Sequence, residues 1–136
     1  MITLNIIPEE TIENLQDRFR KAFPFLNIEC FSGPPAKDGG SAKKMMYPAT
    51  KRLSECMKVK GPVKISVDPA FSVSRFEELL EKSTGLNAQV FRKAGKIWLE
   101  TTATDSWSLA QQNEEGRKSQ TEVREEIESP DDHDIY

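Results

Sequence analysis

Apolar and polar residues alternate in two short segments of the chain, and each segment ends at a proline. The segments are residues 4–8 (LNIIP) and 65–69 (ISVDP), where apolar side chains recur at every second position. This period is typical of a strand with one buried face that ends at a turn. Each segment is followed by apolar residues at helical spacing, which are Ile12, Leu15 and Phe19 after the first and Val73, Phe76 and Leu80 after the second.

The two patterns are copies of one unit. A single constant offset superposes both the strands and the helical stripes, so that Ile12 aligns with Val73 and Phe19 with Leu80. After the helices, an offset shorter by one position superposes 26–31 (LNIECF) on 86–91 (LNAQVF). The order strand, proline, helical stripe, strand therefore occurs twice, at about residues 3–31 and 63–91. A match over so many ordered features predicts an internal repeat.

Two strand–helix–strand units in tandem predict an α+β fold of the ferredoxin-like type, the split βαβ repeat. We expect one antiparallel sheet with two helices on one face. The first strands of the two halves, residues 3–7 and 63–67, should be adjacent at its centre. Ser74 and Glu77 have the spacing of a capping box in the second helix, and Gly85 is placed to end that helix. The alternative is another α+β roll in which the two units pack in a different order.

Two additions extend the repeat. Residues 32–61 begin with glycine and proline, which indicates a loop, and a short inserted helix is expected after Pro48. Residues 91–98 predict a hairpin that turns at Ala94 and Gly95, with Phe91 opposite Trp98. This hairpin would add a fifth strand at about residues 96–102.

The apolar residues are concentrated in residues 1–110, which hold 46 of the 50. Residues 114–136 carry nine acidic and three basic side chains, so this end has a net charge of −6 and the rest of the chain +3. A short helix is expected at 106–115, capped by Thr104 or Asp105 and closed by Gly116. The sequence thus predicts a single α+β domain at 1–110 and an acidic, mostly disordered tail at 111–136, with a frayed helix near 121–128.

Composition also bears on the class of protein. No apolar run approaches the ~20 residues of a membrane-spanning helix, and the amino terminus has no targeting signal. We therefore expect a cytoplasmic protein with no membrane partner, in which Cys30 and Cys56 are reduced. Cys30 alternates with Leu26 and Ile28, so it is expected in the core.

Candidate chemistry is sparse. The only histidine, His133, falls in the expected tail, so it is not positioned as a base for nucleophilic catalysis. The two cysteines are far apart in the sequence and do not make a zinc site. The glycines at 33, 39 and 40 lack the order of a phosphate-binding loop. We expect no catalytic, metal-binding or cofactor-binding residue, and an enzyme ranks below the two binding classes considered next.

Positive charge is concentrated in the middle of the chain. Residues 37–64 contain eight cations against Asp38 and Glu55, a local charge of +6. Such a segment can follow a nucleic-acid backbone or bind an acidic protein; it can also be a solvated surface or one that the acidic tail covers. The candidate polyanion-binding residues are Lys43, Lys44, Lys51, Arg52 and Lys58. Base stacking on the sheet is not expected, because the outward positions of its central strands are Thr3, Asn5, Lys64 and Ser66.

A second candidate region is residues 98–107 (WLETTATDSW), which hold two tryptophans, three threonines and two carboxylates. In the functional interpretation, Trp98, Glu100, Asp105 and Trp107 form a small polar pocket or a peptide-binding edge. In the structural interpretation, the segment is a strand rich in β-forming residues, followed by a helix cap, and its aromatics close the core. Carboxylates of unknown separation do not indicate acid–base chemistry.

Residues 90–113 (VFRKAGKIWLETTATDSWSLAQQN) resemble the carboxyl-terminal block of a family of small uncharacterised bacterial proteins. The preceding helix, residues 74–86, is similar as well, so the resemblance covers roughly a third of the chain. It implies a bacterial, cytosolic origin. Because that family has no assigned activity, the resemblance assigns a role to no residue of this chain.

These patterns leave two hypotheses from different classes. The first is a non-enzymatic protein-interaction or regulatory module that uses the hairpin edge or the basic insert to bind a protein partner, including a second copy of the chain. The alternative is an electrostatic binder of nucleic acid or another polyanion through the basic segment 37–64.

Overall fold

The structure is a computed structural model that describes residues 1–34 and 45–127, with side chains described as far as Thr121. In chain order, the first half comprises strand β1 (Ile2–Ile6), helix α1 (Ile12–Ala22), strand β2 (Leu26–Phe31) and the 3-10 helix η2 (Leu53–Glu55). The second half comprises β3 (Val63–Val67), α2 (Val73–Thr84), β4 (Asn87–Ala94), β5 (Ile97–Glu100), η3 (Thr102–Thr104) and α3 (Leu109–Ile127). The α+β class expected from the sequence is confirmed.

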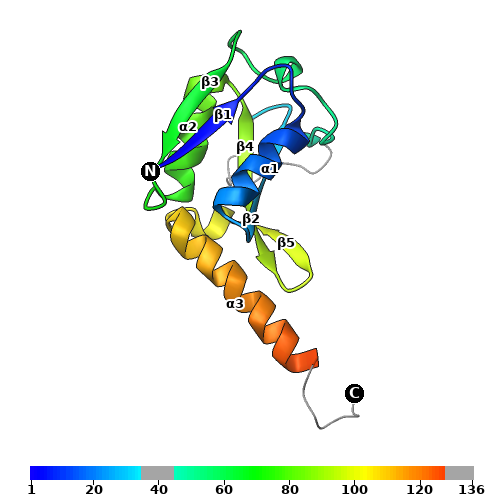
Figure 1. Ribbon diagram of the computed structural model, residues 1–136, viewed down its shortest axis with the longest axis vertical. Helices are drawn as coiled ribbons and strands as arrows, with labels where there is room; N and C mark the ends of the chain where they lie inside the picture. Colours follow the sequence, from blue (N-terminus) through cyan, green and yellow to red (C-terminus); the bar gives the residue numbers. More distant parts are fainter. Residues whose placement is uncertain (35–44, 128–136) are drawn as a thin grey trace.

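The internal repeat is visible in the backbone (Figure 1). Strands β1 and β3 have the same length and the same sequence of exposed and buried positions. They pair antiparallel, with Ile2 opposite Val67 and Ile6 opposite Val63, so the expected adjacency of the two opening strands is confirmed. The following helices are capped at equivalent positions of the repeat, by Thr11 and Ser72.

The expectation of one continuous sheet is corrected. The strands are hydrogen-bonded into two antiparallel sheets, β1–β3 and β2–β4–β5, in an arrangement compatible with a ferredoxin-like one. β2 pairs with β4 along one edge. At the end of the opposite edge of β2 lie residues 45–47 of the insert. There the Tyr47 amide donates to the Cys30 carbonyl at 2.8 Å, and the Ser32 amide donates to the Met45 carbonyl at 2.9 Å. The insert thus bonds to the end of the β2 edge opposite β4.

The core lies where the two helices meet the sheets. α1 packs against β1 and β2, whereas α2 packs against β3 and β4. The helices touch through the stacked rings of Phe19 and Phe76, whose centres are 5.3 Å apart. Both rings are buried in one cluster with Ile28 and Val90 from the larger sheet. Burial of these large side chains supplies the main driving force for folding.

Two local predictions about the helices have different outcomes. Gly85 ends α2 with φ at 83°, as expected for a glycine after a helix. The capping box of Ser74 and Glu77 is wrong: Ser72 caps α2 by accepting the Arg75 amide at 3.1 Å. The Glu77 carboxylate instead accepts a bond from β4. The insert after Pro48 does contain a short helix, but it is the single 3-10 turn η2 with Leu53 buried.

The carboxyl-terminal helix differs most from expectation. α3 runs without interruption through Gly116 to Ile127, so the expected helix end at Gly116 and a disordered segment starting at 111 are both corrected. In Figure 1 the far end of α3 extends away from the rest of the molecule. Gly116 is buried against Phe25, which explains a glycine inside the helix. Residues 128–136, with His133, lie outside the described part of the chain.

Candidate functional site

The hairpin of β4 and β5 forms one side of the larger sheet. Its register differs from the predicted one: Lys93 lies opposite Trp98 and Phe91 opposite Glu100. The turn consists of Gly95 and Lys96, one residue later than expected. Gly95 has φ at 62°, the conformation that favours glycine at the first position of a two-residue hairpin turn. The fifth strand is accordingly shorter than the predicted 96–102.

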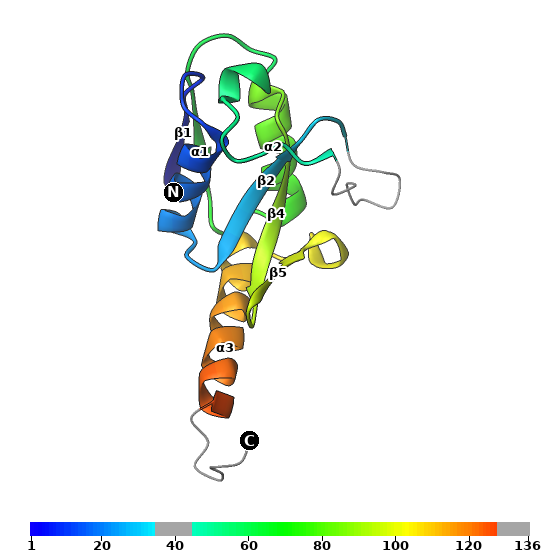
Figure 2. The same cartoon turned by 90° about the vertical axis from the view of Figure 1, so that its right-hand side faces the viewer.

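β5 is an edge strand with an apolar surface. Its solvent-exposed fractions are 59% for Ile97, 37% for Trp98 and 40% for Leu99, and Glu100 is exposed as well. β4 covers one edge of β5, and no other strand among the described residues pairs with the opposite edge (Figure 2). Edge strands usually carry charges, prolines or bulges that prevent further pairing. Three consecutive exposed apolar residues make this edge receptive to another strand.

The hydrogen-bonding direction along β5 follows from its neighbours. The Thr101 amide donates to the Val90 carbonyl at 3.3 Å, so Thr101 faces β4. In an antiparallel pair, backbone groups of successive residues point to alternate sides. Ile97 and Leu99 therefore bond to β4, while Trp98 and Glu100 direct their amides and carbonyls away from the sheet.

A hollow of about 300 Å³ adjoins this edge. It is lined by Phe31, Met46, Phe91, Trp98, Leu99 and Glu100. The aromatic rings come from β2, β4 and β5, and Met46 comes from the insert that pairs with β2. The Lys93 ammonium lies 4.9 Å from the centre of the Trp98 ring, a cation–π contact that orients the indole. An apolar hollow beside a free strand edge can receive alternate side chains of an added strand.

Helix α3 braces the hairpin through polar contacts. The Gly95 amide donates to the Ser119 hydroxyl at 3.2 Å, and the Gln120 side-chain amide donates to the Gly95 carbonyl at 2.8 Å. The Ser119 hydroxyl also lies 3.1 Å from the Lys93 carbonyl and 2.7 Å from the Gly116 carbonyl. These contacts fix the turn that precedes β5, so the edge strand is held in a defined position.

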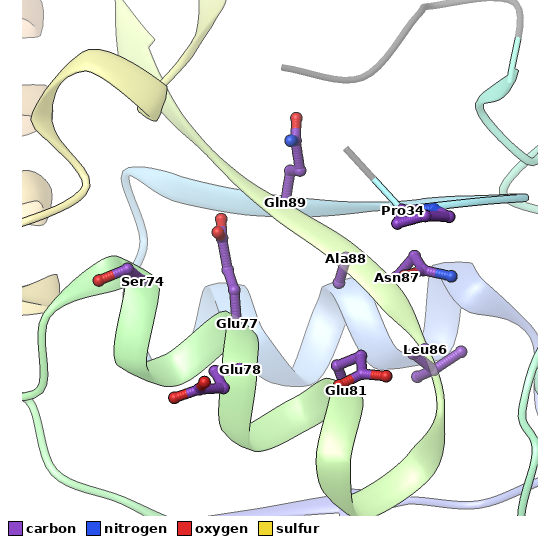
Figure 3. A pocket seen from close by; sticks show the side chains of 9 residues that line it. All are labelled: Pro34, Ser74, Glu77, Glu78, Glu81, Leu86, Asn87, Ala88 and Gln89. Carbon is purple, nitrogen blue, oxygen red and sulfur yellow. The ribbon is translucent and has the colours of Figure 1, made fainter. Parts of the chain in front are cut away.

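A second hollow, of about 340 Å³, lies between α2 and β4. Figure 3 shows Glu77 extending from α2 toward β4 beside this hollow, with Glu81 and Asn87 at its other end. The Glu77 carboxylate accepts the Val90 amide at 2.8 Å. Burial, with a smaller contribution from the nearby carboxylates of Asp105 and Glu100, raises the pKa of Glu77 to about 7 against the lowering effect of this hydrogen bond.

Glu77 is a largely buried acid beside this second hollow, but the hollow lacks the further groups that a reaction centre needs. Acid–base catalysis needs a second group in reach of the same substrate atom. The other ionisable groups that line the hollow are the carboxylates of Glu78 and Glu81. Among the described residues, no group of three His, Cys, Asp or Glu side chains is arranged to hold a metal ion. We therefore interpret Glu77 as a structural carboxyl group.

The candidate residues of segment 98–107 fall into two places. Trp98 and Glu100 lie on β5 and line the apolar hollow. Asp105 and Trp107 instead hold the first turn of α2, since their carbonyls accept the Ser74 and Val73 amides at 2.9 and 3.0 Å. The Trp107 ring also lies 5.8 Å from the Arg92 guanidinium.

Two of the described cations of the basic segment, Lys51 and Arg52, contact other parts of the fold through their side chains. The Arg52 guanidinium donates to the Glu9 carbonyl at 2.6 Å, and the Lys51 ammonium lies 5.3 Å from the Tyr47 ring and 4.0 Å from Glu55. Lys58 is exposed, and only its backbone amide is bonded, to the Thr84 carbonyl at the far end of α2. Lys43 and Lys44, like Lys37, lie outside the described residues.

The cysteines occupy different environments. Cys30 is buried in the core as expected, and burial raises the pKa of its thiol to about 12. Cys56 is only partly buried, and burial raises its pKa as well. A thiol with a raised pKa holds less of the reactive thiolate at neutral pH. Neither cysteine therefore has the environment of an activated nucleophile.

Comparison with known proteins gives no family assignment: the chain matches no protein-family model, no curated protein and no solved structure.

No helix in the described ranges is both long and apolar enough to cross a bilayer.

Sequence reasoning identified Trp98 and Glu100 but missed their partners in the hollow. Phe31, Met46 and Phe91 come from three separate segments, so no local pattern links them. The apolar run at 97–99 does not alternate with polar residues, so it indicates a strand but not which face is exposed. The unbroken run is the one sequence feature that could have indicated an exposed apolar edge, because a strand with one buried face needs apolar residues only at alternate positions.

Proposed function

We propose that this protein is a non-enzymatic interaction module that binds an extended segment of a partner protein along the outer edge of β5. One observation carries the proposal: Ile97, Trp98 and Leu99 are exposed in a row on an edge that no other described strand covers. In β-augmentation the backbone bonds of the added strand supply affinity, and side-chain pockets supply specificity. The edge of β5 offers the first, and the adjoining hollow offers the second.

Rigidity of the edge supports the same proposal. β5 is held on its inner side by β4 and at its turn by Ser119 and Gln120 of α3. A strand that is already ordered loses little conformational entropy when it binds. The hairpin therefore suits recognition of a flexible partner segment, which would supply most of the ordering.

The polyanion-binding alternative receives less support. Lys51 and Arg52 already contact Glu55 and the Glu9 carbonyl, so their charges are partly satisfied within the fold. The Lys58 backbone amide bonds to the Thr84 carbonyl at the carboxyl-terminal end of α2, and the Lys58 side chain is exposed. A backbone-tracking surface needs several free cations along one path, whereas only Lys58 of the three described candidate cations has a side chain without a hydrogen bond, ion pair or ring contact within the described residues.

A charge placed in the edge tests the proposal. Ile97→Lys should abolish capture of a binding partner from cells that make the protein, because a lysine on an edge strand opposes further pairing. Val59→Lys is the matched control, since Val59 is also an exposed β-branched residue, 39% exposed, in a loop away from β5. Partner capture is measured by affinity purification and mass spectrometry, and both variants are checked for unchanged thermal unfolding.

Retention of the same partner by wild type and Val59→Lys, with loss by Ile97→Lys, is the expected result. If Ile97→Lys captures every partner that the wild type captures, the interaction does not use β5 and the proposal fails.

A further inference from the structure

We infer that the strand received by β5 is β5 of a second copy of the chain, paired antiparallel about a two-fold axis at Trp98. This inference rests on the proposed function, because it requires the outer edge of β5 to accept a strand. It specifies the partner and the register of pairing. Two three-stranded sheets would then join into one continuous six-stranded sheet.

Backbone geometry allows this pairing. Trp98 and Glu100 point their amides and carbonyls outward, as the Thr101–Val90 bond and the alternation along β5 require. With the axis at Trp98, each Trp98 amide faces the Trp98 carbonyl of the other copy. Glu100 then lies opposite Lys96 of the other copy, the turn residue that directly precedes β5. The outward backbone groups of Trp98 on the two copies therefore meet, with a lysine and a glutamate on either side of them.

Charge selects this register. Lys96 and Glu100 are both exposed, and neither forms an ion pair within the part of the chain that the structure describes. An axis at Trp98 brings Lys96 of each copy opposite Glu100 of the other, so two symmetric ion pairs form. An axis one residue later, at Leu99, would instead place Glu100 opposite Trp98 and Lys96 opposite Thr102. Opposite charges on facing strands are favourable and like charges are unfavourable.

The apolar side chains also match in this register. Ile97 of each copy lies opposite Leu99 of the other, which covers the two aliphatic side chains that are 59% and 40% exposed in the single chain. The two Trp98 residues lie directly opposite each other on the face that carries the hollow. Side chains of directly opposed residues share a face and are within contact distance. Every residue of β5 thus has a complementary partner on the second copy.

Sedimentation equilibrium of the purified full-length chain tests the pairing. The wild type should pass from a 15.4 kDa species to one of twice that mass as concentration rises. Lys96→Glu or Glu100→Lys should each weaken the dimer about tenfold, because each puts like charges opposite one another at both symmetric contacts. An equimolar mixture of the two variants should dimerise with wild-type strength, since each then supplies the charge that the other lacks. The double variant should also recover. Exposed positions make these substitutions compatible with folding.

The outcomes separate this inference from the proposed function. A wild type that stays at 15.4 kDa at every concentration overturns the second copy as partner. In that case, loss of a captured protein in Ile97→Lys still upholds the edge site, whereas its retention overturns the edge site itself. If the dissociation constant of the dimer is unchanged by both single charge reversals, or if the mixture of the two variants does not restore dimerisation, the proposed register is overturned.

Discussion

At the residue scale, the repeat contains one informative difference. Gln16 and Glu77 occupy equivalent positions on the two helices, under the same offset that aligns Leu15 with Phe76. The Gln16 amide donates to the Ile28 carbonyl at 2.7 Å, whereas the Glu77 carboxylate accepts the Val90 amide at 2.8 Å. The first half thus has a neutral amide where the second half has an acid. Desolvation makes the charged form of that acid unfavourable, and its pKa is raised to about 7.

Glu77 should therefore make stability depend on pH. Its pKa is 4.5 without the fold and about 7 in the folded protein, so the folded state binds the proton more tightly. The free energy of unfolding then falls as pH rises from about 4.5 to about 7. The fall from this group is on the order of 3 kcal/mol. Glu77→Gln, which keeps an oxygen to accept the Val90 amide, should lack this fall and be more stable than wild type at pH 8.

Urea unfolding at pH 5 and pH 8 measures the effect. Glu78→Gln is the control, because Glu78 is an exposed neighbour whose ion pair with Lys82 spans 3.5 Å at the surface; its removal should change stability by less than about 1 kcal/mol. Equal pH dependence in wild type and Glu77→Gln would show that the Glu77 carboxylate is not desolvated.

At the element scale, α3 is the part of the fold that positions the hairpin. It contacts β4 most extensively, and much of that contact is polar: the Asn113 side chain accepts the Phe25 amide at 2.8 Å, and Gln112 accepts from Arg92 at 3.0 Å. Close approach is possible because residue 116 is glycine. A β-carbon there would lie 2.8 Å from the Phe25 β-carbon and 3.0 Å from the Phe25 carbonyl oxygen.

Gly116→Ala should destabilise the protein despite the better helix propensity of alanine. Alanine gains about 1 kcal/mol in a helix interior, but overpacking against a fixed backbone oxygen costs about 1–3 kcal/mol. We expect a net loss of about 1 kcal/mol and a melting temperature lower by several degrees. Gln111→Ala, at an exposed position of the same helix, should leave the melting temperature within about 2 °C of wild type. A higher melting temperature for Gly116→Ala would contradict the packing described here.

Elements with a strong local pattern were predictable, and those set by distant contacts were not. The apolar stripes of α1 and α2 and the alternation in β1 and β3 identified all four elements. In each element the buried positions recur at a single spacing, helical in α1 and α2 and every second residue in β1 and β3. The hairpin register was missed because Gly95 can occupy either turn position in the sequence, and its φ decides. The end of α3 was missed because Gly116 has a packing role that only the contact with Phe25 reveals.

At the scale of the whole molecule, the two halves are joined because strands of one half pair with strands of the other. β1 pairs with β3 and β2 pairs with β4, so each sheet contains a pair of strands that joins the two copies of the repeat. The sequence predicted the first pairing but not the separation into two sheets, since the bonding of the insert to β2 depends on contacts across the chain. The addition of β5 then leaves an apolar edge. Composition placed Trp98 and Glu100 near a binding edge, but the hollow of Phe31, Met46 and Phe91 required the folded chain.

Residue-resolved amide hydrogen exchange on the dilute protein tests the central claim, that the outer edge of β5 is open to receive a strand. We predict alternation along β5, with slow exchange at Ile97, Leu99 and Thr101, which bond to β4, and fast exchange at Trp98 and Glu100. Trp98 and Glu100 should become protected as the protein is concentrated. Protection of these two amides in the dilute monomer, as strong as that of Leu99, would mean that the edge is already covered and would contradict this claim.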